Sequence, residues 1–302
     1  MYERLVERFK EYTVILRPDR DEPEWWAGAP SVLRTEGGTF FLAARMREGI
    51  SPRGRRGYEV RILEGEDGAS FRPIRSIKRE EVGIPGFERP SLVWDPKTGR
   101  FKLYLCGPLE HGWGILKLED VDHPREFDPK TARRVLAAPP PQDDFVSVRG
   151  YKDPFVLWDG EEWHMFVIGS DRVERTYHFT SRDGEEWTPD PENPVLDAGG
   201  WHNFYTRPAC VLPDGVGYLF VYEGSDLSWR DPVYNIATGL AYTLDLSHIV
   251  DLTSSEPLLR STTPGNYHTW RYSHWLRVGE RIYVYAEVAC PDDTNEIRLF
   301  VL

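Results

Sequence analysis

The chain has 302 residues, enough for one large β domain or two ordinary domains, and it carries a formal net charge of −12. This acidic balance argues against nucleic acid as a partner, because phosphate binding needs a basic face. The charged N-terminus lacks the apolar core of a signal peptide, and the sequence has no apolar run of about 18 residues that could span a membrane. We therefore expect a cytoplasmic protein without a membrane partner, and its oligomeric state stays open.

The composition favours short strands joined by frequent turns. Aromatic residues make up 13% of the chain, and it contains 24 prolines and 26 glycines. The three cysteines, Cys106, Cys210 and Cys290, lie far apart in or beside apolar runs. We expect buried free thiols in a reducing compartment rather than disulfides.

The first elements in chain order are a short helix and a strand. The stretch 2-YERLVERFKEY places Leu5, Val6 and Phe9 on one face of a helix. The run 13-TVILR that follows is typical of a strand, and it precedes the first copy of a repeated phrase.

That phrase begins a unit of about 60 residues, which occurs five times. Its copies are 26-WAGAPSVL, 87-FERPSLVWD, 151-YKDPFVLWD, 205-YTRPACVLPD and, more weakly, 271-RYSHWLRVG. Each is followed by a turn and a second strand. Repetition of four-stranded units predicts an all-β fold, a five-bladed β-propeller, and a β-sandwich is the rival that needs no such period. The expected blades of this single domain, 1–302, are 26–80, 87–138, 150–190, 204–252 and 270–302, with 13–17 closing the last blade.

Two units also share an ending, 67-DGASF and 183-DGEEW. In each, an aromatic residue follows the glycine by three positions. We interpret both as tight turns before an outer strand that place the aromatic side chain between neighbouring blades.

Antiparallel pairing brings the start of each first strand and the end of each second strand to one face of the propeller. Acidic, basic and aromatic side chains from all five units should therefore meet there, with Tyr272 and Arg47 among them. The residues that we expect to bind substrate at this face are Trp26, Arg45, Arg89, Lys152, His202, Tyr205, Arg207, His268, Trp270, Arg271 and Glu287.

At these residues the chain resembles the five-bladed propeller glycosidases, which include glycoside hydrolase families 43, 32, 68, 117 and 130. The resemblance covers essentially the whole chain and rests on the repeats, on 150-GYKDPFVLWDG-160, on 88-ERPSLVWDPKTGRFKLYL and on 181-SRDGEEW. It implies a glycosidase whose site lies at the centre of the propeller.

The resemblance to family 43 is incomplete. Asp153 matches the third-blade aspartate, which in that family tunes the pKa of the acid and holds the sugar. Ala29 and Thr206 stand where the family has its other two carboxylates, so its mechanism does not carry over intact. Glu88 takes in the second unit the relative place of the family-43 acid in the fourth. In family 130, some of whose members use phosphate, the second strand of the first blade often ends in arginine, as 42-LAAR does here at Arg45.

Glycoside cleavage needs an acid for the leaving oxygen and a second carboxylate for water or the sugar carbon. The candidates are Asp153, Glu223 and Glu88, with interchangeable roles. Because they come from different units, we expect an inverting hydrolase of small oligosaccharides, for which a separation of about 6.5–9.5 Å leaves room for water. The alternative is that these carboxylates pair with Arg89, Arg207 and Lys152 to hold the blades together.

Several alternatives stay open from the sequence. Converging arginines favour an anionic, uronic-acid-type sugar or phosphate, whereas arginines neutralised by glutamates favour a neutral sugar. A glycoside phosphorylase, a non-catalytic carbohydrate-binding propeller and a polysaccharide lyase are the other functions. We expect no cofactor and no metal in the site, although the resemblance to family 43 allows a structural Ca or Na near the axis, beside His274. Long insertions at 45–57, 119–148 and 225–235 favour a pocket over an open groove.

Overall fold

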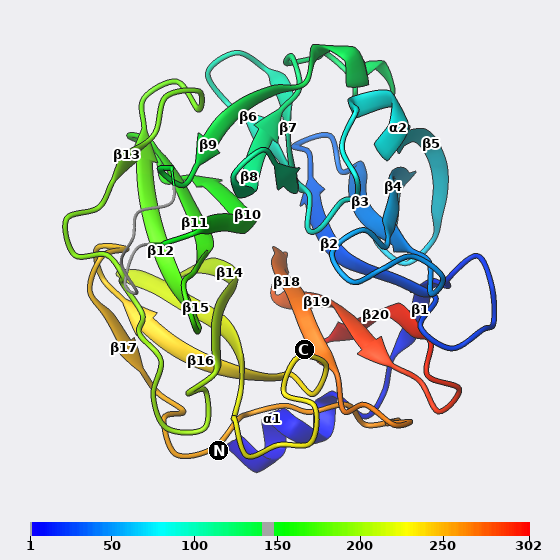
Figure 1. Cartoon of the computed structure of the whole chain (residues 1–302), viewed down its shortest axis with the longest axis vertical. Helices are drawn as coiled ribbons and strands as arrows, with labels where there is room; N and C mark the ends of the chain where they lie inside the picture. The colour runs from blue at the N-terminus through cyan, green and yellow to red at the C-terminus, as the bar shows by residue number, and fades with distance from the viewer. Residues whose placement is uncertain (1, 141–147) are drawn as a thin grey trace.

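The computed structural model describes residues 2–140 and 148–302. This part of the chain is nearly all β, and its antiparallel strands are arranged radially around a centre (Figure 1). Each group of strands pairs in chain order, so that the first strand is innermost and each later strand lies further out.

The strands of the first half form three such ladders. They are β2 (Trp26–Arg34), β3 (Phe40–Arg47), β4 (Gly57–Gly65) and β5 (Phe71–Lys78); β6 (Ser91–Asp95), β7 (Arg100–Leu109), β8 (Gly112–Lys117) and β9 (Arg133–Ala137); and β10 (Gly150–Trp158), β11 (Trp163–Ser170), β12 (Glu174–Ser181) and β13 (Thr188–Pro189).

The second half continues the pattern. Its strands are β14 (Tyr205–Asp214), β15 (Gly217–Ser225), β16 (Ala237–Thr243) and β17 (Ile249–Asp251), followed by β18 (Trp270–Val278), β19 (Arg281–Ala289) and β20 (Asn295–Val301). The short helices are α1 (Tyr2–Arg8) and α2 (Arg79–Val82), and the 3-10 turns are Pro124–Glu126 and Pro129–Thr131.

The last ladder is completed by the beginning of the chain. Strand β1 (Thr13–Leu16) pairs antiparallel with β20, and Thr13 lies opposite Leu299. Phe9, just after α1, is fully buried and packs its ring against Trp270 and Phe300. The predicted helix and the closing strand are both confirmed, and together they fix the N-terminal segment to the C-terminal strands.

The two aspartate–glycine turns have the predicted role, because the aromatic residues that follow them, Phe71 and Trp187, contact the rings of Tyr285 and Tyr104 in the neighbouring ladder. Gly68 and Gly184 adopt positive φ angles of 75° and 76°, which glycine tolerates without a steric penalty. The carbonyl of Gly184 accepts a hydrogen bond from the Tyr104 hydroxyl of the preceding ladder at 2.8 Å, and that of Gly68 accepts one from Tyr285 at 2.6 Å. Neighbouring ladders are therefore joined by equivalent tyrosine–turn contacts.

A bulge in the innermost strand recurs at the position before the proline of the repeated phrase, or before Ser273 where the last copy replaces that proline. Ala29, Asp153 and Tyr272 all have left-handed backbone conformations, with φ of 50°, 57° and 52°, and the strand register shifts beside each of them. This conformation costs about 1–3 kcal/mol for a residue other than glycine and is found at functional sites. The bulge thus redirects one side chain at an equivalent place in three ladders.

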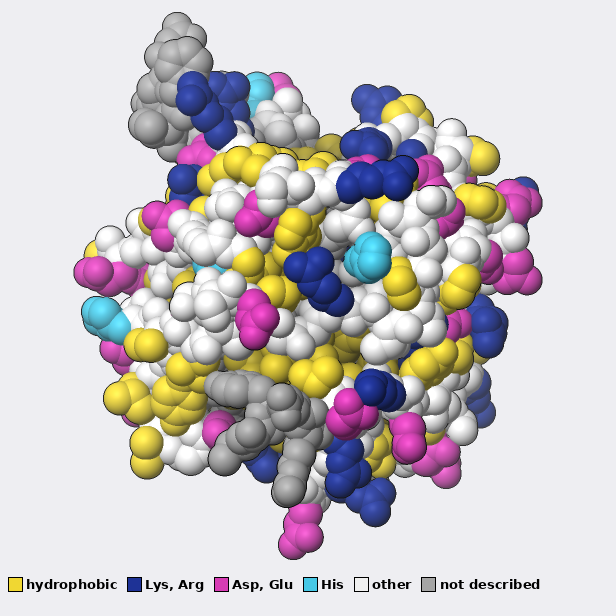
Figure 2. Space-filling view, turned by 90° about the horizontal axis from the view of Figure 1, so that it is seen from below, with side chains coloured by type: hydrophobic (Ala, Val, Ile, Leu, Met, Phe, Trp, Pro, Cys, Tyr) yellow, Lys and Arg dark blue, Asp and Glu magenta, His cyan; other side chains and the backbone are white. Residues whose placement is uncertain are grey.

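The three cysteines are buried free thiols, as predicted. No helix among the described residues is long and apolar enough to cross a membrane. On the face shown in Figure 2, acidic and basic side chains are interspersed with hydrophobic ones. The net acidic charge is therefore not concentrated in one block on this side.

Candidate active site

A cavity of about 130 Å³ lies where the predicted face of the ladders meets two of the insertions. Its wall is strongly cationic, with Glu88 as the one carboxylate among the residues that line it. Those residues are Arg47, Arg53, Gly54, Glu88, Trp113, Lys152, Tyr205, Arg207, Val233, Tyr234, Arg271 and Tyr272. Insertions 45–57 and 225–235 contribute to the wall as expected, whereas 141–147 of the third insertion lie outside the described residues.

The backbone beneath this cavity is organised by the three bulges. The N–H of Tyr272 donates a hydrogen bond to Glu223 of the preceding ladder, and the N–H of Ala29 donates to Glu287 at 3.0 Å. The N–H of Asp153 is directed in the same way at the Cys106 sulfur, 3.3 Å away. In these three cases a ladder supplies, from its second strand, the group that caps the bulge of the next ladder.

Glu88 is the predicted catalytic carboxylate that reaches the cavity, and its side chain is 19% exposed. It forms an ion pair with Arg45, whose side chain is fully buried. Burial by itself raises the pKa of Glu88, but the charges of Arg45, Arg47 and Lys152 outweigh it and lower the pKa to about 2. Glu88 is therefore ionised at neutral pH and suited to act as a base or to stabilise positive charge.

Asp153 lies just behind the cavity wall and is only 1% exposed. Its carboxylate accepts a hydrogen bond from the backbone N–H of Arg89 at 3.1 Å and one from the Tyr272 hydroxyl at 3.0 Å. Since Tyr272 does line the cavity, this hydroxyl is the link between Asp153 and the space that a ligand can enter. Burial raises the pKa of Tyr272, and the negative charges of Asp153 and Glu88 raise it further, so the phenol stays protonated.

Glu223 is fully buried on β15, opposite Arg207 in the strand register. One carboxyl oxygen accepts from the Tyr272 N–H, and the other has no hydrogen-bond partner among the described residues. Burial raises the pKa of Glu223 to about 7, although Arg207, the Tyr272 N–H and Arg271 act in the opposite direction. A carboxyl group with this pKa is protonated often enough near neutral pH to donate a proton.

Glu287 occupies the equivalent place on β19, opposite Arg271. It is fully buried and accepts hydrogen bonds from Arg271 at 2.8 Å, Arg45 at 3.0 Å and the Asn295 amide at 2.7 Å. Burial acts to raise its pKa, but the two arginines lower it overall. Because its donors surround it, Glu287 fixes the two arginines and does not line the cavity.

A second buried ion-pair cluster centres on Glu174, which the sequence reasoning missed. Its carboxylate pairs with Lys152 at 2.7 Å and with Arg207. Both cations line the cavity while Glu174 does not. Glu174 is the first residue of β12, the third strand of its ladder. The site was predicted from the starts of first strands and the ends of second strands, which do not include this position.

The remaining predicted residues are divided between this cavity and the protein interior. Tyr205 lines the cavity, with the Arg207 guanidinium 3.7 Å from its ring centroid. Arg89 is buried and donates to the carbonyls of Pro208 and Ala209. Trp26 is fully buried behind Arg47, with 3.9 Å between the guanidinium and the ring centroid.

Three predicted binding residues lie away from the cavity. Trp270 is fully buried and packs against Phe9. His202 is buried and hydrogen-bonds Thr206 at 2.9 Å and Asp251 at 3.1 Å. His268 lines another hollow. The sequence correctly placed these residues near strand starts, but it does not reveal which way each side chain points.

Five cavity residues were not singled out from the sequence: Arg53, Gly54, Trp113, Val233 and Tyr234. Arg53, Val233 and Tyr234 lie in insertions, and Trp113 belongs to a third strand. Arg47 and Tyr272 could be placed at this face from the repeat, because they end a second strand and occupy a bulge position.

The described residues contain no group of three or more histidine, cysteine, aspartate or glutamate side chains that could hold a metal ion. His274, the residue considered for an axial cation, is buried, and its Nδ1 accepts from the Val32 N–H at 3.4 Å. Burial, together with the charge of Arg89, lowers the pKa of His274 to about 3. Its environment thus holds it as a neutral residue between strands.

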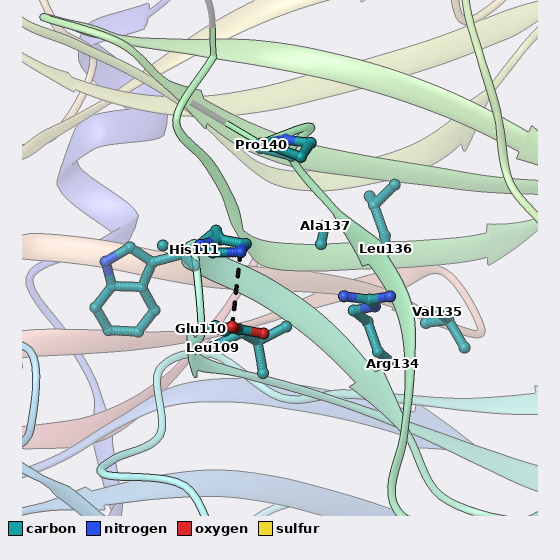
Figure 3. A pocket seen from close by; sticks show the side chains of 11 residues that line it. Leu109, Glu110, His111, Arg134, Val135, Leu136, Ala137 and Pro140 are labelled. Carbon is teal, nitrogen blue, oxygen red and sulfur yellow. Dashed lines mark ion pairs between the residues drawn. The ribbon is translucent and has the colours of Figure 1, made fainter. Parts of the chain in front are cut away.

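Another hollow lies beside the outer part of the β7–β9 ladder (Figure 3). It includes Arg134, Leu136 and Pro140, and the Glu110–His111 ion pair at 3.8 Å crosses one side. Glu110 and His111 are both more than half exposed. Among the described residues, this hollow lacks the buried carboxylates found behind the cavity at the centre of the ladders.

No protein-family model matches the chain. Solved structures with the same fold include a glycoside hydrolase with 15% identity and a TM-score of 0.75, covering 100% of this chain and 95% of that chain. A thermostable family-43 glycoside hydrolase has 14% identity and a TM-score of 0.65, covering 94% and 91%. The β-1,2-mannobiose phosphorylase from Listeria innocua, in complex with β-1,2-mannobiose, has 13% identity and a TM-score of 0.67, covering 95% and 94%. The chain thus has the fold of propeller glycosidases and related carbohydrate-active enzymes.

Proposed function

We propose that the protein is a glycoside hydrolase of small oligosaccharides, built as a single five-bladed propeller with its active site at the central cavity. The observation that carries this proposal is that two carboxyl groups at or behind the cavity have pKa values shifted in opposite directions. Glu88 lines the cavity with its pKa lowered to about 2, while burial raises the pKa of Glu223 to about 7. Groups whose pKa values are driven apart are what acid–base cleavage of a glycosidic bond requires.

In this proposal Glu223 is the proton donor and Glu88 is the base that activates water, so that the sugar configuration inverts. Asp153 positions Tyr272 through the hydroxyl hydrogen bond and adds negative charge behind it. Tyr272 contacts both buried carboxylates and lines the cavity. Because Glu223 accepts from the Tyr272 backbone and does not itself line the cavity, this proposal requires the structure around Tyr272 to shift before a substrate can reach Glu223.

The test is a screen of chromogenic glycosides and oligosaccharides, neutral and uronic, on the wild type and on Glu223→Gln and Glu88→Gln. We expect sugar release by the wild type and its loss in both variants, with all three proteins equally folded by circular dichroism. A folded wild type that binds sugars but releases no product would instead support a carbohydrate-binding propeller. An unsaturated product that absorbs in the ultraviolet would support a lyase.

Phosphorolysis is the second candidate function. The cavity wall carries five cationic side chains, and one protein with the same fold is a phosphorylase. Running the same screen with and without inorganic phosphate separates the two reactions, because a phosphorylase releases a sugar phosphate only when phosphate is present.

A further inference from the structure

The charges around the cavity do not balance. Six buried or nearly buried cationic side chains face five carboxyl groups, and the raised pKa of Glu223 removes part of the negative charge. The six cations are Arg45, Arg47, Arg89, Lys152, Arg207 and Arg271, and the five carboxyl groups are Glu88, Asp153, Glu174, Glu223 and Glu287. An excess of buried positive charge is costly unless an anion offsets it.

Two of the six cations, Arg47 and Arg89, form no ion pair with a carboxylate among the described residues, and of these two only Arg47 lines the cavity, because the Arg89 guanidinium donates to backbone carbonyls. Lys152 and Arg207 share Glu174, and Arg45 and Arg271 share Glu287. Arg47 is only 6% exposed and forms no ion pair with a carboxylate of the residues that the structure describes. Within the same residues, its Nε has no hydrogen-bond partner.

The surroundings of Arg47 hold its guanidinium in place at the cavity wall. Its Nη2 donates to the Tyr234 hydroxyl at 2.8 Å, and its Cζ lies 3.9 Å from the Trp26 ring centroid. Burial lowers the pKa of Arg47 to about 10, so it remains charged at neutral pH. A fixed, charged guanidinium that lines the cavity and has no carboxylate partner among the described residues is arranged to bind an oxyanion.

We propose that Arg47 is a specificity-determining residue that binds the carboxylate of a uronic-acid-type sugar, so that the substrate itself carries the missing negative charge. This inference rests on the proposed function, because it assumes that the cavity binds a sugar. The excess is one charge with all five carboxyl groups ionised, and two when Glu223 is protonated as the proposed proton donor. A singly charged carboxylate offsets the charge at Arg47 and places less negative charge beside the ionised Glu88 than a phosphate dianion would.

Direct binding tests this proposal without depending on turnover. Calorimetric titrations would compare D-galacturonate, D-glucuronate and D-mannuronate with the corresponding neutral hexoses, on the wild type, Arg47→Met and Arg47→Lys. The matched control is Arg34→Met, which removes an exposed arginine from the opposite end of the neighbouring strand β2. Thermal unfolding of every variant checks that it is folded.

We expect the wild type to bind at least one uronate about tenfold more tightly than its neutral counterpart, as one charge-assisted hydrogen bond can provide. Arg47→Met should abolish this preference, Arg47→Lys should retain part of it, and Arg34→Met should leave it unchanged.

Equal binding of uronates and hexoses by the wild type, or a preference that survives in folded Arg47→Met, would overturn the proposal. Tighter binding of neutral hexoses in the presence of inorganic phosphate would also overturn it, because the anion would then be a separate reactant. If no substrate is cleaved but the uronate preference is present, the hydrolase proposal fails and the assignment of Arg47 stands.

Discussion

Glu223 and Glu287 occupy the same place in two consecutive ladders, yet their environments give them opposite properties. Each is fully buried on a second strand, lies opposite an arginine and caps the bulge N–H of the next ladder. Glu287 also accepts hydrogen bonds from Arg45, Arg271 and Asn295, and its pKa is lowered. Glu223 has one oxygen without a partner among the described residues, and its pKa is raised to about 7.

The difference shows that equivalent positions in a repeated fold can take different roles, depending on which ion pairs form around them. The arginine opposite Glu287 pairs with it, whereas Arg207 opposite Glu223 pairs with Glu174 instead. Because Arg207 forms its ion pair with Glu174, Glu223 has no ion-pair partner of its own among the described residues to stabilise its ionised form. One position in the repeat has become a structural ion pair, and the equivalent position has become a candidate acid.

The largest expected effect is on turnover in Glu223→Gln. Removal of a general acid should lower kcat/KM by about 10²–10⁴-fold, as measured by initial rates on the substrate found in the screen. The free energy of unfolding should change little, because glutamine resembles the protonated carboxyl. A Glu223→Gln enzyme with near wild-type kcat/KM would show that Glu223 is only a cap for Tyr272.

Glu287→Gln should act mainly on stability. The substitution leaves Arg45 and Arg271 without their shared carboxylate, and loss of one partner from a buried ion pair costs about 3–5 kcal/mol. Urea denaturation of this variant beside Glu223→Gln measures the contrast directly. Equal losses of unfolding free energy in the two variants would contradict the distinction drawn between them.

The pH dependence of kcat/KM should sharpen the same contrast. If Glu223 must be protonated, kcat/KM should be constant below about pH 6 and fall about tenfold per pH unit above pH 7. Glu88, with its pKa lowered to about 2, should add no acidic limb above pH 4. The residual activity of Glu223→Gln should lack the alkaline limb, and its persistence there would assign that limb to another group.

The sequence predicted the ladders and their order well, because the repeated phrase marks each first strand and the turn after it marks an antiparallel pairing with the next strand. It also placed Glu88, Asp153 and Glu223 near one another, since strand starts and strand ends converge on one face. It could not predict the pairing of Glu174 with Arg207, which depends on how two ladders pack. Nor could it separate Trp26 and Trp270, which are fully buried, from Tyr205 at the cavity, because all three occupy similar positions in the repeat.

A smaller effect is expected from a buried histidine pair away from the cavity. His178 Nε2 lies 2.9 Å from His164 Nδ1, and His178 Nδ1 lies 2.8 Å from Asp190. Burial lowers the pKa of His178 to about 4, against the effect of Asp190. Because the unfolded state takes up a proton first, the free energy of unfolding should fall by up to about 3 kcal/mol as the pH drops from about 6.5 to 4.

His178→Gln should flatten this pH dependence, as followed by urea denaturation at several pH values. The control is His248→Gln, which replaces an exposed histidine. Unlike the change at Glu223, neither substitution should alter the alkaline limb of kcat/KM. An unchanged pH dependence of stability in His178→Gln would show that His178 does not titrate on unfolding.

The most direct test of the contrast between Glu223 and Glu287 is a titration of the glutamate carboxyl carbons by ¹³C NMR, with Glu223→Gln and Glu287→Gln used for assignment. The predicted result is one carboxyl that titrates near pH 7 and disappears from the spectrum of Glu223→Gln, while the Glu287 carboxyl stays ionised to below pH 4.5. If both carboxyls remain ionised down to that pH, Glu223 is a structural ion like Glu287, and the assignment of the proton donor is wrong.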